Sequence, residues 1–189
     1  AENGDYYRLL VPGSYQVTFN SIGYEPQTQS IVIDNSPINI DIQLSIDESL
    51  LSANIEDFES ESFNNYNWQF SGNSDWQIDN ISADGLYSAR SGEIGNNQFS
   101  EISLDIYSLE PSEISFYKKV SCENVGSQTG NYYDYLAFYI DGVEQDKWAG
   151  EIDWSLSSFP IESGEHNLKW TFIKDQGVSS GQDAAWIDF

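Results

Sequence analysis

Apolar and polar residues alternate with a period of two along much of this chain, which is the pattern of a strand with one buried face. Residues 38–46, INIDIQLSI, show it most clearly: the aliphatic side chains share one face, and Asn, Asp and Gln share the other. Aromatic residues make up 15% of the chain, and Gly, Asn, Ser and Asp recur between the apolar segments. Such a composition favours strands and turns. The sequence therefore predicts an all-β protein built of antiparallel sheets.

The first 46 residues form one predicted domain, a small β-sandwich. We expect strands at residues 6–13, 14–24, 28–34 and 38–46, the first ending in a Pro-Gly turn, because Pro12 presets φ and Gly13 tolerates a positive φ. The pattern blurs after residue 46, so residues 47–53 are predicted to be a linker.

Residues 54–189 differ in composition: aromatic residues are more frequent, and turn residues recur about every 8–12 positions. This spacing is typical of a sandwich or jelly roll. Both faces of residues 135–140 are apolar, so we expect a central strand there. The strands expected in this domain are residues 68–72, 76–80, 101–108, 112–121, 133–142, 143–150, 166–175 and 183–189.

The charge balance excludes some partners. With 7 basic and 31 acidic side chains the formal net charge is -24. A field of this sign repels nucleic acid and anionic lipid, and no apolar run is long enough to predict membrane insertion. Three explanations of the acidic excess stay open: solubility in a salty medium, calcium binding by some of the carboxylates, and attraction of a basic partner.

The sequence lacks the residue combinations that common hydrolase mechanisms need. The chain has one histidine, His166, and no His-x-x-Glu run, so it cannot supply the ligands of a zinc peptidase. No Ser-His-Asp signature surrounds His166, and nothing singles out a carboxylate pair for glycoside cleavage. The single cysteine, Cys122, excludes an intrachain disulfide and is expected to pack as a small apolar residue. We therefore expect no catalytic residue in this chain.

Residues 3–44 resemble the C-terminal half of the transthyretin-like (carboxypeptidase regulatory-like) domain that follows the catalytic domain of many zinc carboxypeptidases. The resemblance rests on GDYYRLLVPGSY, on the Tyr, Val, Thr and Phe of YQVTF, and on GYEP. It implies a neighbouring catalytic domain rather than an activity of this chain. The missing opening strands, and a last strand that runs to Phe189 without a turn signal, lead us to expect an internal piece of a longer polypeptide whose signal peptide lies upstream.

Residues 54–189 resemble the MAM / cleaved-adhesin group of concanavalin-like jelly rolls, found in large secreted bacterial proteins. The matching segments are IEDFES, GLYSARSGEIGNNQFSEI, ISFYKKVSCE, YDYLAFYIDG, WAGEIDWS, GEHNLKWTFIKD and GQDAAWIDF. The group shares a fold more reliably than an activity, so the resemblance implies adhesion, binding or folding support.

Calcium is the predicted cofactor, in a structural role. Asp57 and Glu59 are two residues apart, so on a strand they would share a face. The resemblance to jelly rolls implies that such a pair on the first strand shares an ion with an Asp on the last strand, here Asp188. Asp134 and Asp183, beside the central and last strands, are secondary ligand candidates, or turn caps. The alternative for Asp57, Glu59 and Asp188 is that they are solvated edge charges.

A sugar-binding surface is a further hypothesis, because Trp148 and Trp154 lie in a Gly-containing segment that we expect to be a loop region. The alternative is that they belong to the core. Together these features predict a non-catalytic accessory region of a secreted bacterial zinc carboxypeptidase, located outside the cell or on its surface. Its expected partners are the catalytic domain and a protein or polysaccharide surface. The competing hypothesis is a free-standing carbohydrate-binding or adhesin module.

Overall fold

The computed structural model describes residues 9–20, 24–45, 56–126 and 128–189. The chain divides into two compact units, Ala1–Ala53 and Asn54–Phe189, which are described separately below.

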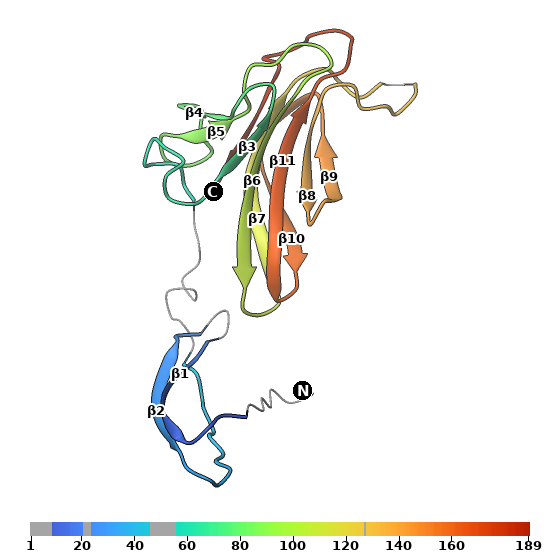
Figure 1. Cartoon of the computed structure of the whole chain (residues 1–189). Coiled ribbons are helices and arrows are strands. Elements are labelled where there is room, and N and C mark those ends of the chain that lie inside the picture. The colour runs from blue at the N-terminus through green and yellow to red at the C-terminus, as the bar shows by residue number, and fades with distance from the viewer. Residues whose placement is uncertain (1–8, 21–23, 46–55, 127) are drawn as a thin grey trace. The chain divides into compact units, whose positions relative to one another are not determined.

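The N-terminal unit contains an antiparallel pair of strands, β1 (Gly13–Phe19) and β2 (Gln27–Ile33), shown in blue in Figure 1. The register runs from Gly13 opposite Ile33 to Phe19 opposite Gln27. Outward-facing hydroxyls pair across the strands, with the side-chain oxygens of Thr18 and Thr28 2.9 Å apart. Such cross-strand pairs help to fix a register that a two-stranded sheet specifies weakly by burial.

The prediction of a strand at residues 38–46 is wrong for its described part. Residues 38–45 belong to no strand, although Ile40, Ile42 and Leu44 are half-buried in alternation. Among the described residues, a backbone hydrogen bond from Glu25 N to Ser45 O at 2.9 Å connects this segment to the rest of the unit. The period of two predicts an extended backbone, but a strand also needs a neighbour to complete its ladder of hydrogen bonds. Of the strand predicted at residues 6–13, residues 6–8 lie outside the described residues; for residues 9–12 the prediction is wrong, because they belong to no strand and β1 begins at Gly13.

The C-terminal unit is a sandwich of two five-stranded sheets in which each pair of neighbouring strands is antiparallel (Figure 1). One sheet has the order β10-β7-β12-β5-β4 and the other β3-β6-β11-β8-β9. From β3 to β12 the chain changes sheet at every step except β4 to β5 and β8 to β9, as in a jelly roll. The strands are β3 (Gln69–Gly72), β4 (Gln77–Asp79), β5 (Ser88–Arg90), β6 (Phe99–Ser108), β7 (Ser112–Ser121), β8 (Tyr135–Ile140), β9 (Val143–Trp148), β10 (Glu151–Ile161), β11 (Gly164–Ile173) and β12 (Ala184–Asp188).

The all-β sandwich predicted from the sequence is confirmed, and the part of the chain that the structure describes contains no helix. β8 is a central strand as expected, because it pairs with both β11 and β9. β5, which has only three residues, and β10 were not predicted from the sequence. β10 is an edge strand that carries Pro160. Proline cannot donate to a ladder and is confined to such edges, so it made this segment resemble a loop.

Aromatic side chains from both sheets fill the space between them. The rings of Phe138 and Trp170 lie 4.9 Å apart in the second sheet, and Phe116 of the first sheet meets Trp170 edge-on at 5.2 Å. All three are essentially buried. Each such ring stabilises the fold by roughly 2–3 kcal/mol through burial alone. This rigid core holds the strand ends from which the loops below emerge.

Candidate functional site

The register of β8 and β11 brings charged residues together at one end of the sandwich. β8 begins at Tyr135, which lies opposite Ile173, the last residue of β11. Asp134 directly precedes this pair, and Lys174 and Asp175 directly follow it. Because the strands are antiparallel, these side chains leave the sheet at the same end.

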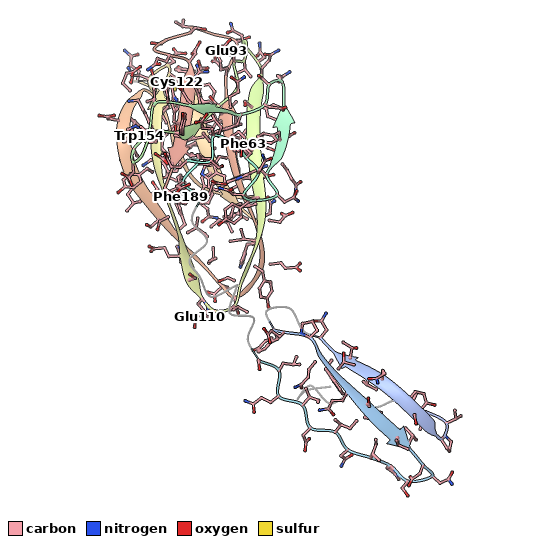
Figure 2. All side chains as sticks on the ribbon, turned by 90° about the vertical axis from the view of Figure 1, so that its left-hand side faces the viewer. Phe63, Glu93, Glu110, Cys122, Trp154 and Phe189 are labelled. Atoms are coloured by element: carbon pink, nitrogen blue, oxygen red, sulfur yellow. The ribbon has the colours of Figure 1, made fainter. Side chains whose placement is uncertain are left out.

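The neighbouring sheet contributes further carboxylates at the same end. Ser121, the last residue of β7, lies opposite Ala184, the first residue of β12. Glu123 follows two residues after β7, and Asp183 directly precedes β12. Figure 2 labels Cys122 at this end and Glu110, just before β7, at the other.

Asp134 and Lys174 form the buried part of this cluster, with 1% and 3% of their surfaces exposed. Asp134 Oδ1 accepts a hydrogen bond of 2.9 Å from Asp175 N. Asp134 Oδ2 lies 3.8 Å from the Lys174 ammonium, and no described group is within hydrogen-bonding range of it. The ammonium instead donates to Asp183 and, at 2.8 Å, to Ser179 Oγ.

Three carboxylates, which we call the acidic group, converge here: Glu123, Asp134 and Asp175. One carboxylate oxygen from each lies within 4.8 Å of the others. Within the described residues, no other set of three or more His, Cys, Asp or Glu side chains comes this close. Burial raises the pKa of Asp134. Desolvation and then the negative charges of Asp134 and Asp175 raise the pKa of Glu123. Both raised pKa values mean that the folded state disfavours the negatively charged forms of Asp134 and Glu123.

Cys122 lies beside the acidic group but is chemically inert there. Its thiol is buried and donates to the Asp134 carbonyl oxygen at 3.2 Å. Burial raises its pKa to about 12, so the thiol stays protonated. The thiolate is the reactive form of cysteine, and both burial and the raised pKa disfavour it at Cys122. It packs in the core, as the sequence predicted.

A second feature, which we call the tyrosine hollow, lies beside β8 and β9. It is an open concavity of about 420 Å³ lined by Gly130, Asn131, Tyr132, Tyr133, Tyr135 and Lys147. The rings of Tyr132 and Tyr135 are 5.8 Å apart at 77°. The Lys147 ammonium lies 5.1 Å and 5.7 Å from their centres and forms a 2.9 Å ion pair with Glu144. Aromatic faces next to amide and ammonium donors can bind a polyhydroxylated ligand.

Asp57 and Glu59 do not lie on a strand, contrary to the prediction. Residues 59–67 form turns and bends, and the intervening Phe58 has a positive φ of 54° while its side chain is fully buried. The two carboxylates therefore do not share a strand face. Asp57 Oδ1 accepts a hydrogen bond of 3.2 Å from Glu59 N, which closes a local turn.

Glu59 and Asp188 hold one loop from two sides. Glu59 Oε1 accepts backbone hydrogen bonds from residues 86 and 87 at 2.7 and 2.9 Å. Asp188 Oδ2 accepts from residues 83 and 84 at 2.7 and 3.2 Å. Asp57, Glu59 and Asp188 do not form a three-carboxylate group within 4.8 Å. Calcium binding by these residues stays a prediction.

The secondary ligand candidates Asp134 and Asp183 both lie beside the Lys174 ammonium. Asp183 pairs with Lys174 rather than joining the acidic group. Trp148 ends β9, not a loop, and packs against Phe116 and Phe159 with ring centres 6.1 and 6.4 Å away.

Trp154 likewise lies on a strand rather than in a loop. It is half-buried on β10, where the pairing with β7 shifts register between Ile152 and Ser155. Neither tryptophan contributes to the tyrosine hollow.

His166 has no nitrogen left for a metal. Its Nδ1 lies 2.7 Å from Asp141 Oδ2, and its Nε2 lies 2.9 Å from the Glu162 carbonyl oxygen. Since Nδ1 and Nε2 are both engaged in hydrogen bonds, and no second histidine exists, the residues do not fit a zinc centre of the peptidase type.

In the described part of the chain, no helix is long and apolar enough to span a membrane. No family model matches the chain. A segment of 44 residues is 48% identical to the carboxypeptidase N catalytic chain of Rattus norvegicus, covering 23% of this chain and 10% of that protein. A segment of 53 residues is 40% identical to carboxypeptidase D of Rattus norvegicus, covering 28% of this chain and 4% of that protein. The chain thus spans at most 10% of the length of these two relatives.

Two solved structures show distant similarity. TmCBM61 in complex with beta-1,4-galactotriose aligns with a TM-score of 0.49 at 14% identity, over 70% of this chain and 90% of that one. The secreted serine protease VesC from Vibrio cholerae aligns with a TM-score of 0.45 at 14% identity, over 60% of this chain and 23% of that one. The chain is therefore an all-β protein with partial identity to carboxypeptidases, which is consistent with an accessory or binding domain.

Proposed function

We propose that this chain is a non-catalytic accessory region of a secreted zinc carboxypeptidase, and that it stabilises the catalytic domain or holds it near its substrate. The 48% identity to a carboxypeptidase N catalytic chain over 44 residues carries this proposal. We attribute the match to the N-terminal unit, because GDYYRLLVPGSY carries the resemblance to the transthyretin-like domain.

The side chains support an accessory role over a catalytic one. The single histidine has both nitrogens in hydrogen bonds, and the single thiol is buried with its pKa raised to about 12. A hydrolase that acts through zinc or a thiolate needs the opposite: open ligands or a depressed pKa.

The accessory role is tested on the longer polypeptide. The coding sequence around this chain should encode a zinc carboxypeptidase domain, and its absence would end the proposal. Where the domain is present, we expect deletion of residues 1–189 to lower its melting temperature or its rate on protein substrates. Unchanged stability and unchanged rates would contradict the proposal. The purified chain, incubated with peptides and zinc, should release no C-terminal amino acid.

A second candidate function is carbohydrate binding, favoured by one observation, the tyrosine hollow. Tyr132 is partly exposed, and Tyr132 and Tyr135 line the concavity together with the Lys147 ammonium. Stacking of a sugar ring on an aromatic face and hydrogen bonds to its hydroxyls are the contacts that such a surface offers.

Affinity electrophoresis against a panel of soluble polysaccharides tests this second function. We expect retardation that Tyr132→Ala and Tyr135→Ala abolish. Tyr117→Ala, an exposed tyrosine on β7, serves as the matched control and should retain binding. A loss in Trp154→Ala alone would place the sugar on β10 instead. Equal mobility of the wild type in every gel would remove the carbohydrate-binding hypothesis.

A further inference from the structure

The acidic group carries more negative charge than its surroundings neutralise. The acidic group and the neighbouring Asp183 share one buried cation, the Lys174 ammonium, which pairs with Asp134 and Asp183. Four carboxylates and one ammonium leave a formal charge of -3 at this end of the sandwich. Like charges at such distances repel strongly where water is partly excluded, so an additional cation would be attracted here.

A second, independent observation also indicates a cation-binding position beside Asp134. Asp134 is 1% exposed, and its Oδ2 has no hydrogen-bond partner among the described residues. The Lys174 ammonium is 3.8 Å away, beyond hydrogen-bonding distance, and is already bound by Asp183 and Ser179. Buried carboxylate oxygens normally have a partner, and an unpaired one calls for an explanation such as an ion.

The donor set selects the kind of ion. The three side chains offer only carboxylate oxygens, and the neighbouring Cys122 thiol is buried and donates to the Asp134 carbonyl oxygen. The histidine, His166, lies on β11 and is hydrogen-bonded to Asp141, so it contributes no nitrogen ligand to the acidic group. Oxygen ligands from two separate loops, β7–β8 and β11–β12, suit the flexible, high coordination of calcium better than the nitrogen and sulfur chemistry of zinc.

We propose that Glu123, Asp134 and Asp175 form a calcium-binding site that joins the end of β7, the start of β8 and the end of β11. The ion would replace the repulsion among these loops with attraction. The segment between Glu123 and Asp134 also carries four residues of the tyrosine hollow, so calcium would also order that surface. This site is separate from Asp57, Glu59 and Asp188 and is independent of the proposed accessory role.

Calorimetric titration of the purified chain with CaCl2, paired with thermal melts in EGTA and in CaCl2, tests the proposal. We expect saturable binding and a rise in melting temperature of about 5–10 °C at calcium a hundredfold above its dissociation constant. NaCl at equal ionic strength should not reproduce the rise. If it does, the effect is screening of the net charge of -24, and the proposal is overturned.

Two variants identify the ligands. Glu123→Gln and Asp134→Asn should each weaken calcium binding by at least about tenfold, because affinity follows the number of charged ligands. Glu113→Gln is the matched control: it makes the same change at the exposed start of β7 and should bind as the wild type does. Wild-type affinity in both test variants would place any calcium elsewhere and overturn the proposal.

Glu123→Gln also separates a metal ligand from a merely structural residue. In EGTA this variant should melt above the wild type, since it removes a charge that Asp134 and Asp175 repel. In calcium it should melt below the wild type, since it removes a ligand. A variant that melts lower in both conditions would show a structural role and contradict the assignment. Glu59→Gln should leave the calcium response of the acidic group unchanged.

Discussion

The carboxylate of Asp134 and the ammonium of Lys174 are both almost fully buried, yet they lie 3.8 Å apart rather than at hydrogen-bonding distance. Lys174 directly follows β11 and Asp134 directly precedes β8, so the strand register fixes their proximity. Lys174 bonds instead to Asp183, which directly precedes β12. One cation thus connects the ends of both sheets.

Replacement of Lys174 by Met should strongly destabilise the chain. The variant leaves two carboxylates, Asp134 and Asp183, without their cation, and the loss of one partner of a buried ion pair costs about 3–5 kcal/mol. Urea unfolding in EGTA measures the loss. The double variant Asp134→Asn/Lys174→Met should recover part of it. A loss below about 1 kcal/mol would show that the pair contributes no more than a surface salt bridge.

The pair His166 and Asp141 should give a pH-dependent contribution to stability. The hydrogen bond to Asp141 is the main cause of a raised His166 pKa, and the backbone N–H of Asn167 and then His166 lower the pKa of Asp141. A raised histidine pKa stabilises the folded state fully below the unfolded value of about 6.5. That contribution is lost as pH rises through the folded pKa.

His166→Gln should therefore lower the free energy of unfolding slightly at pH 5.5 and leave it almost unchanged at pH 9. The effect is small because Asp141 is about half exposed. Chemical denaturation at both pH values checks this, with Glu165→Gln, the neighbouring exposed position, as the control. Equal losses at both pH values would show that the ring acts by packing rather than by charge.

The strands were predictable wherever alternation and aromatics coincide. Residues 112–121 match β7 at both ends, and residues 135–140 form the central strand expected from their two apolar faces. β10 was not predicted, because its serines and Pro160 interrupt the alternation of apolar and polar residues. Alternation in residues 38–45 indicates an extended backbone, but it does not show whether another strand pairs with this segment, and among the described residues none does.

The acidic group was only partly predictable. Asp134 was recognised because it borders a central strand, whereas Glu123 and Asp175 were missed. Each of these two residues lies two positions after the end of a strand, and this position is the feature of the sequence that could have identified them. Which strand ends meet depends on the registers of β8 with β11 and of β7 with β12. Which strands pair depends on contacts between distant parts of the chain, and the alternation of apolar and polar residues within one strand does not determine it.

Truncation of Trp170 should test the core on which all these loops depend. Its ring contacts Phe116, Phe138 and Trp68 and is 1% exposed. Trp170→Ala should cost about 3–5 kcal/mol, because it removes buried surface and leaves a cavity between the sheets. Trp154→Ala, on the edge strand, is the control and should cost much less. Similar losses for the two variants would contradict the described packing.

Gly85 should tolerate no side chain, and this tests the role of Glu59 as the support of the loop 83–87. Gly85 has a φ of +64°, and a Cβ added there would collide with the Glu59 carboxylate, which accepts hydrogen bonds from residues 86 and 87. Gly85→Ala should therefore destabilise the chain by about 1–3 kcal/mol, through strain at a positive φ and displacement of Glu59. Gly142→Ala has a similar φ of +77° with nothing nearby, so it measures the backbone strain alone. The difference in unfolding free energy between the two variants isolates the collision, and equal values would show that Glu59 moves aside freely.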